Sequence, residues 1–380
     1  MAVPLLDLTR QNSALHAALT EAFERVLRSG HFIMGPEVDA FEKECAAHLG
    51  ATHAVSVSSG TDALLLSLMA LDIGPGDEVI CPSFTFFATA GSIARLGAIP
   101  VFADVDPISF NLDPQDVQRR ITPRTKAIMP VHLFGQAAEM SPLLELAQAH
   151  RLRVIEDAAQ AFGARLGERC CGTLGDLGTF SFFPSKNLGG FGDGGLVTTQ
   201  DDSLADRLRL LRTHGSRPKY YHREVGGNFR MDALQCALLR VKLPHLEAYT
   251  EARRSHARRH SSALAALPGV HPAQLATPDS RIVLPLELEG RRHIWNQFTL
   301  RVRGAGRRDS LRDHLAARRI GTEIYYPLPL HLQQCFSQLP KVSIPVTEAL
   351  SQEVLSIPVF PELTLPETEE LAQAIKEWLS

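Results

Sequence analysis

The stretch AVSVSSGTDALLLSLMALDIGPGDEVICP, residues 54–82, contains the pattern that decides the fold. Its two ends are short apolar runs typical of buried strands, and the DALLLSLMAL segment between them is typical of a helix. The alternation continues with apolar runs at 100–105, 127–131 and 153–157 and a helical segment at 141–150. Apolar strands separated by helices predict a parallel sheet that is covered on both faces.

Further elements extend this pattern toward the C-terminus. TFSFF at 179–183 and GLVTT at 195–199 are expected to add strands to the same sheet, and a long helical tract follows from Met231 to about His260. Beyond Pro268, a strand at QFTLRVRG and helices at RDSLRDHLAARR and ETEELAQAIKEWL predict a smaller α+β unit.

Composition excludes several classes of protein. The 380 residues are 44% hydrophobic and 21% charged, which is typical of folded proteins rather than disordered ones. A net charge of -3 offers no general attraction for nucleic acid or an anionic membrane. The longest apolar runs, such as Ala63–Leu66, are far shorter than the roughly 20 residues that span a bilayer, and the start does not resemble a secretory signal. We therefore expect a cytoplasmic protein that does not enter a membrane.

Two polar segments follow predicted strands, at the sheet edge where ligands bind in such folds. SSGT at residues 58–61 opens a helix, whose free N–H groups suit a phosphate. The alternative is a helix N-cap without a ligand. Asp157 ends the strand in VIEDAAQ, and a carboxylate there needs a cation or hydrogen-bond donors. It could cap a helix, or it could pair with a protonated ring nitrogen.

Lys186 lies in SFFPSKNLGGFGDGG, residues 181–195, after two aromatic residues and a proline and before five glycines. This arrangement leaves open space around a partly desolvated amine. Desolvation lowers the pKa of a lysine and favours the neutral amine, which can form an imine with an aldehyde. The alternative is a solvated lysine on a flexible turn. The segment fits neither GxxxxGK[ST] nor GxGxxG in its βαβ context, so it does not predict a nucleotide phosphate loop.

One cofactor accounts for the three segments together. A phosphate cradle, an aspartate for a pyridinium nitrogen and a lysine for an aldehyde are the three attachment points of pyridoxal 5'-phosphate (PLP). The chain between Asp157 and Lys186 is long enough for a turn and a strand to bring both to one sheet edge. In HREVGGNFRMDALQ, Asn228 and Arg230 precede a helix, and on their own they indicate only a loop and a helix start.

The chain also resembles the fold-type I PLP enzymes of the DegT/DnrJ/EryC1/StrS family, the sugar-nucleotide aminotransferases. The resemblance covers nearly the whole chain, in HFIMGPEV, SSGTDAL, GPGDEVICPSFTFFATA, TPRTKAIMPVHLFGQ, VIEDAAQAFGA, SFFPSKNLGGFGDGG, GNFRMDALQCALLRVKL and YYPLPLHLQ. It implies an α/β protein whose large PLP-binding domain, residues 1–247, has a mostly parallel seven-stranded sheet between helices. Residues 248–380 would form a smaller C-terminal α+β domain.

The resemblance also implies roles for individual residues. Lys186 would bind the cofactor covalently and move a proton, and Asp157 would hold the pyridine nitrogen protonated. The other cofactor contacts would be Gln160 at the phenolic oxygen, Phe86 on the ring, Gly60, Thr61 and Ser181 at the phosphate, and Asn228 from the neighbouring subunit. A homodimer with shared active sites follows. Phe86 and its aromatic neighbours Phe84 and Phe87 could instead be core residues.

The implied reaction moves the amino group of glutamate to a keto sugar carried on a nucleoside diphosphate. GSRPKYYHREVGGN resembles the branch that acts on 3-keto sugars more than the 4-keto branch. Tyr325 stands where many relatives carry His. The candidates for the substrate pocket are His31, Tyr221, His222, Arg230, Tyr325 and His331.

Several segments and relatives allow alternative interpretations. The basic segment EARRSHARRH, residues 251–260, is more typical of a solvated or interface helix than of a nucleic-acid site, so no nucleic-acid partner is expected. His256 and His260 lack an accompanying carboxylate or cysteine, so no metal site is expected. Related enzymes aminate cyclitol ketones or make aminohydroxybenzoate. Dehydratases of the family typically carry His at the position of Lys186. A rival of another class is a PLP-binding regulator without turnover.

Overall fold

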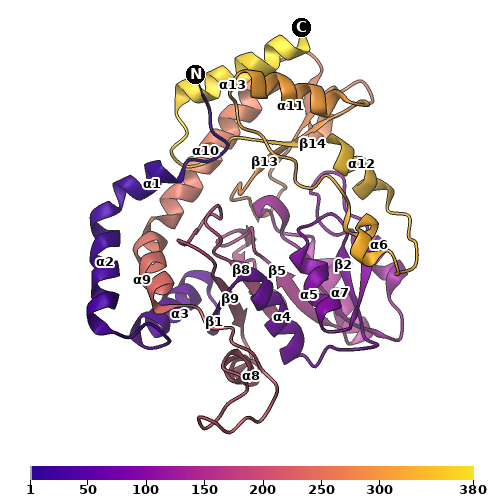
Figure 1. Ribbon diagram of the computed structural model, residues 1–380. Coiled ribbons are helices and arrows are strands. Elements are labelled where there is room, and N and C mark those ends of the chain that lie inside the picture. The colour runs from indigo at the N-terminus through magenta and orange to yellow at the C-terminus, as the bar shows by residue number, and fades with distance from the viewer. Residues whose placement is uncertain (1) are drawn as a thin grey trace.

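A seven-stranded sheet forms the centre of the computed structural model, which describes residues 2–380 (Figure 1). The strand order is β1-β9-β8-β5-β4-β2-β3. The strands are β1 (His53–Val57), β2 (Glu78–Pro82), β3 (Ile99–Ala103), β4 (Thr125–Ile128), β5 (Arg153–Asp157), β8 (Leu177–Ser181) and β9 (Gly195–Thr199). Only β9 runs antiparallel to its neighbours in this sheet, so the predicted, mostly parallel seven-stranded sheet is confirmed.

Helices cover both faces of the sheet. One face is covered by α4 (Gly60–Ala70), α5 (Ala88–Arg95) and α8 (Asp202–Arg212), and the other by α3 (Pro36–Leu49), α6 (Pro114–Arg120) and α7 (Met140–His150). Side chains alternate along each strand, so Val79 and Cys81 pack on the first face and Ile80 on the second. This burial on both sides explains why the strands are apolar throughout.

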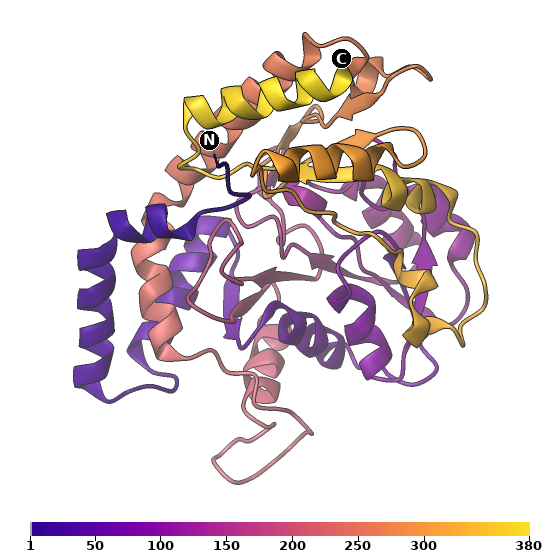
Figure 2. The same cartoon turned by 45° about the horizontal axis from the view of Figure 1, so that its top comes forward.

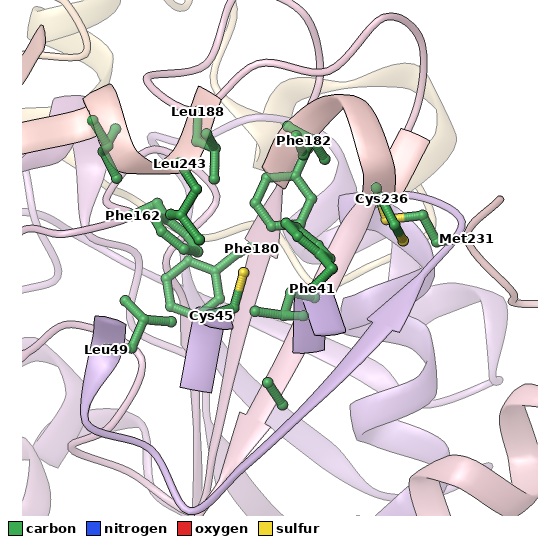
Figure 3. Close-up of a cluster of buried hydrophobic side chains, with 14 of the residues drawn as sticks. Phe41, Cys45, Leu49, Phe162, Phe180, Phe182, Leu188, Met231, Cys236 and Leu243 are labelled. Atoms are coloured by element: carbon green, nitrogen blue, oxygen red, sulfur yellow. The ribbon is translucent and has the colours of Figure 1, made fainter. Parts of the chain in front are cut away.

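A buried aromatic cluster lies under the loop that contains Lys186 (Figure 3). The ring of Phe182 packs edge-on against the rings of Phe41 of α3 and Phe162, at centroid distances of 5.3 and 5.6 Å. Leu188 is buried in the same cluster. Phe182 and Leu188 flank Lys186 in sequence, so the core holds the loop from both sides.

Two more helices stack outside α3. α9 (Ala233–Lys242) packs on α3, and α2 (His16–Ser29) packs on α9 (Figure 2). The expected tract from Met231 to His260 is not one helix, because a 3-10 turn (Leu243–His245) separates α9 from α10 (Leu246–Ala265). Pro244 lies in this turn, and a proline has no N–H to continue a helix.

The C-terminal part of the chain builds a second sheet, in the order β10-β11-β13-β14. Its strands are β10 (Val270–Pro272), β11 (Ile282–Leu284), β13 (Phe298–Val302) and β14 (Val354–Ile357), and its helices are α10, α11 (Arg307–Ala317) and α13 (Leu365–Leu379). The smaller elements are α1 (Leu8–Ala14), α12 (Pro345–Glu353), and a small sheet of β6 (Arg165–Leu166), β7 (Arg169–Cys170) and β12 (Arg291–Arg292). The domain boundary between 247 and 248 stays a prediction, and it falls in the first turn of α10.

The loop at residues 213–228, after α8, extends away from the body of the molecule (Figures 1 and 2). Tyr220 and Val225 within it are 78% and 90% exposed. Across residues 2–380, helices with the length and apolarity needed to span a membrane are absent.

Candidate active site at the carboxyl edge of the sheet

Asp157 is the last residue of β5 and is buried at the carboxyl edge of the sheet. Its backbone is fixed on one side, because its N–H donates to the Pro130 carbonyl and its carbonyl accepts from the N–H of His132. The carboxylate accepts from the Thr89 hydroxyl at 2.8 Å and from the Ala159 N–H at 3.2 Å. Burial raises the pKa of Asp157, while the hydrogen bond from Thr89 opposes this shift.

Lys186 lies on a turn just beyond β8, and its N–H donates to the Phe183 carbonyl. Burial lowers the pKa of Lys186 to about 8, and the nearby charge of Asp157 opposes this shift. Roughly a tenth of the amine is therefore neutral at pH 7, far more than for an ordinary lysine. The structure thus brings Lys186 and Asp157 together, as predicted, and it favours the desolvated amine over a solvated lysine.

The start of α4, which we predict to bind a phosphate, lies beside β8. Ser59 is the N-cap of α4. The hydroxyls of Ser58 and Ser59 both donate to the Asp62 carboxylate, so these two protons are already used within the chain. The N-cap interpretation is therefore correct for Ser59. The backbone N–H groups of Gly60 and Thr61, the first two helical residues, have no acceptor within the helix and can receive an anion.

Gly60 and Ser181 are in close contact at this cradle. A Cβ atom on Gly60 would lie 2.7 Å from the Cβ of Ser181, which is shorter than any normal contact. A glycine is therefore needed where α4 passes the end of β8. The predicted phosphate residues Gly60, Thr61 and Ser181 thus lie together, at the same sheet edge as Asp157.

Gln160 and Tyr326 form the next part of the site. The Gln160 side chain accepts from the Phe134 N–H at 2.6 Å and donates to the Tyr326 hydroxyl at 3.1 Å. Phe86 is 58% exposed, and its ring centroid lies 6.3 Å from that of Tyr326. Phe84 is buried, so it is a core residue. Phe86 is exposed and is therefore available to a ligand.

The predicted substrate residues do not all gather at this site within one chain. Tyr221 and His222 lie in the extended 213–228 loop, where the His222 ring contacts the His214 carbonyl at 2.8 Å. Arg230 donates to the Asn228 side chain at 2.8 Å. His31 is exposed after the end of α2. Arg230 lies near the start of α4, because the adjacent Phe229 carbonyl accepts from the Ser58 N–H at 2.9 Å, whereas Tyr221 and His222 are exposed on the extended loop.

Tyr325 and His331 lie on the segment that returns to the large sheet. Tyr325 lines a small cavity of about 50 Å³ with Ser185, next to Lys186. The His331 ring contacts the Ser83 hydroxyl at 2.7 Å and Glu348 at 3.3 Å, so it holds this segment at the end of β2. Tyr325 therefore lies close to the site, whereas His331 has protein partners on both ring nitrogens.

Sequence reasoning missed Thr85, Thr89 and Tyr326. All three contact Asp157, Gln160 or each other through their hydroxyls. A signal was available for the threonines, because SFTFFATA follows β2 at the same sheet edge as Asp157. Tyr326 comes from far along the chain, and only the fold places it beside Gln160.

The histidines of α10 have structural partners. The rings of His256 and His260 contact the carbonyls of Pro361 and Pro358, at 3.2 and 2.9 Å. Burial lowers the pKa of His260 to about 4, which keeps its ring neutral. Within residues 2–380, His, Cys, Asp and Glu side chains form no group of three or more that could hold a metal ion.

These residues fit PLP on three observations: unpaired N–H groups at the start of α4, a buried carboxylate at the end of β5, and a desolvated lysine beside it. On this sheet, that combination is typical of a PLP-dependent enzyme of fold type I. The chain belongs to the DegT/DnrJ/EryC1/StrS aminotransferase family, which it matches over residues 14–376. Aminotransferases of this family depend on PLP.

Similar proteins cover the whole chain. The chain is 46% identical to a pleiotropic regulatory protein of Geobacillus stearothermophilus, over 100% of this chain and 99% of the relative. It is 44% identical to the dTDP-3-amino-3,4,6-trideoxy-alpha-D-glucose transaminase of Streptomyces venezuelae, over 99% of this chain and 96% of the relative. The crystal structure of S. venezuelae DesV in complex with a ketimine intermediate matches with a TM-score of 0.93 and 44% identity, over 100% of this chain and 99% of that one.

Proposed function

We propose that this aminotransferase moves the amino group of glutamate to the 3-keto group of a sugar linked to a nucleoside diphosphate. The observation that carries the chemistry is the buried Asp157 with the partly buried Lys186, beside the free N-terminus of α4. The similarity to the dTDP-3-amino sugar transaminase supports the substrate class and the 3-position. The net charge of -3 is compatible with this substrate, because a diphosphate can be held by a few local donors.

PLP, when bound, supplies an aldehyde for imine formation and a ring that accepts electrons. Lys186 Nζ, partly neutral near neutral pH, can take a proton from the α-carbon of the amino donor and return one to the product. The Asp157 carboxylate would hold a proton on the pyridine nitrogen, and Gly60 and Thr61 would bind the phosphate through backbone N–H groups. Gln160 would contact the phenolic oxygen of the cofactor, and Phe86 would pack on its ring.

We also propose a homodimer in which each subunit completes the site of the other. The extended 213–228 loop carries exposed Tyr220, Tyr221 and Val225, and a lone chain gives these side chains little to pack against. The outer helix α2 also exposes Phe23 and Leu27, at 44% and 57%. Asn228 lies at the base of this loop and would reach the phosphate of the partner's cofactor.

Replacement of Lys186 by Ala tests the chemistry. The variant should lose both turnover and the visible absorbance that a covalently bound cofactor gives. If both persist, Lys186 is not the attachment point. A panel of glutamate with 3-keto and 4-keto sugars, each on dTDP or UDP, would then test the substrate. Preference for a 4-keto sugar, or for a cyclitol ketone without a nucleotide, would contradict the proposed substrate.

A second candidate function is a PLP-binding regulator without turnover. The observation that favours it is the 46% identity to a protein named as a pleiotropic regulator. The two candidates differ in one measurement. An aminotransferase converts its bound cofactor to the amine form when glutamate alone is added, whereas a regulator without turnover leaves the spectrum unchanged.

A further inference from the structure

Two buried threonines form a chain of hydroxyl groups that ends on Asp157. The Thr89 hydroxyl, on the first turn of α5, lies 2.8 Å from Oδ2 of Asp157. The Thr85 hydroxyl lies 3.1 Å from that of Thr89. Thr85, Thr89 and Asp157 are 2%, 0% and 5% exposed, so bulk water does not replace these contacts.

The direction of the protons follows from the carboxylate. An ionised carboxylate only accepts, so Thr89 must donate its single hydroxyl proton to Asp157. Thr89 can then only accept from Thr85, and Thr85 is the donor of the second bond. Each bond in such a chain polarises the next, so the charge of Asp157 is stabilised by both hydroxyls.

The carboxylate has few other donors. Its Oδ1 atom receives only the longer 3.2 Å contact from the Ala159 N–H. The titratable groups around Asp157 are Lys186 on its loop, His132 after β4, Cys81 on β2 and Tyr326. Among these, the charges of Lys186 and then of His132 lower the pKa of Asp157.

We propose that Thr89, backed by Thr85, is a positioning residue that keeps the Asp157 carboxylate ionised and holds its Oδ2 atom, so that Oδ1 is left for the ring nitrogen of PLP. This inference rests on the proposed function. Without the Thr89 hydroxyl, which Thr85 supports, the buried carboxylate loses its shortest hydrogen bond, and its protonated form becomes relatively more stable. A protonated Asp157 cannot hold a proton on the pyridine nitrogen by charge.

The test compares three variants of the PLP-loaded enzyme. Thr89→Val keeps the shape and removes the hydroxyl, Thr89→Ser keeps the hydroxyl and removes the methyl, and Thr85→Val removes only the second donor. The readouts are the pH dependence of the bound cofactor's absorbance, the dissociation constant for PLP, and kcat and KM for glutamate. Thr277→Val, on an exposed loop, is the matched control.

Thr89→Val should lower kcat about ten- to a hundred-fold, the range expected for a hydrogen bond to a charged group, with little change in KM. It should also move the acid limb of the absorbance profile to higher pH and weaken PLP binding. Thr89→Ser should recover most of the lost kcat and most of the shift in the absorbance profile. Thr85→Val should lower kcat and shift the profile in the same direction as Thr89→Val, but by less.

Three outcomes would overturn the proposal. One is an unchanged pH profile in Thr89→Val. Another is Thr89→Ser as impaired as Thr89→Val, which would mean that the methyl packing matters. The third is Thr85→Val indistinguishable from the unmodified enzyme, which is also the deciding result if Thr89→Val does not fold. If the unmodified enzyme fails to react with glutamate, the proposed function fails, yet the absorbance profile and PLP affinity still decide the role of Thr89.

Discussion

Gly60 lies where the start of α4 is too close to Ser181 for any side chain. A Cβ there would lie 2.7 Å from the Ser181 Cβ, so Gly60→Ala must push α4 and β8 apart. We expect PLP to bind at least about ten-fold more weakly, because the N–H groups of Gly60 and Thr61 then miss the phosphate. Fluorescence titration with PLP measures this. Gly74→Ala is the control, since a Cβ there meets nothing within 4 Å. Equal affinity in both variants would contradict the predicted cradle.

Lys186 gives a prediction about pH. Its pKa of about 8 lies below the ordinary value because burial penalises the ammonium form, while the Asp157 charge favours that form. In the PLP-free protein, the reaction of Lys186 with an amine-directed reagent should rise with a midpoint near pH 8. Exposed lysines, with a pKa of about 10.4, should react only at higher pH. Peptide-resolved mass spectrometry separates the two.

Asp157→Asn provides the control for this pH dependence. Removing the carboxylate charge takes away the group that raises the pKa of Lys186, so the midpoint should move below that of the unmodified protein. A midpoint that stays or rises would mean that Asp157 does not act on Lys186 electrostatically.

Individual residues were predictable from sequence to different degrees. Lys186, Asp157 and Gly60 stand out because each lies at or just after the end of an apolar strand, where a charged residue or a glycine is not explained by packing in the core. Thr89 carries no charge and looks like an ordinary small helix residue, so its contact with Asp157 emerges only from the fold, which brings the start of α5 to the end of β5. The partners of His331 were likewise hidden, since Ser83 and Glu348 come from distant segments.

At the scale of elements, α9 holds the glycine-rich loop that follows Lys186. Lys242 at the end of α9 is 2% exposed, and its Nζ donates to the Gly189 carbonyl at 2.6 Å. Gln235, also on α9, accepts the Phe191 N–H at 2.9 Å. Lys242→Met keeps the length of the side chain and leaves the carbonyl unpaired. Hydrogen exchange of residues 187–195 should become faster, and PLP should dissociate several-fold faster.

Lys126→Met, which alters an exposed lysine on β4, is the matched control for this prediction. If exchange in residues 187–195 is the same in both variants, then the aromatic cluster around Phe182 and Leu188 is enough to hold the loop, and α9 adds nothing to it.

The elements themselves were largely predictable, because strands buried on both faces leave a continuous apolar signal. The antiparallel direction of β9 was not readable, since GLVTT has the same pattern in either direction. The break between α9 and α10 was missed because the spacing of Leu238, Val241 and Leu246 continues across Pro244. The extended 213–228 loop has no strong periodicity, so its conformation was not predictable from the sequence.

At the scale of the whole molecule, the shared-site homodimer predicts complementation between two inactive variants. Lys186→Ala lacks the amine, and Asn228→Ala lacks the phosphate contact that we assign to the neighbouring subunit. In a mixed dimer, one site receives Lys186 from one chain and Asn228 from the other, so it is intact. With equal amounts co-expressed, half of the dimers are mixed and one site in two works, so about a quarter of full activity should return.

Lys186→Ala with Asp157→Asn is the matched control, because both residues belong to the same chain's site and neither site of that mixed dimer is whole. Recovery in the first pair alone would place Asn228 in the partner's site, whereas equal behaviour of the two pairs would mean that each chain completes its own.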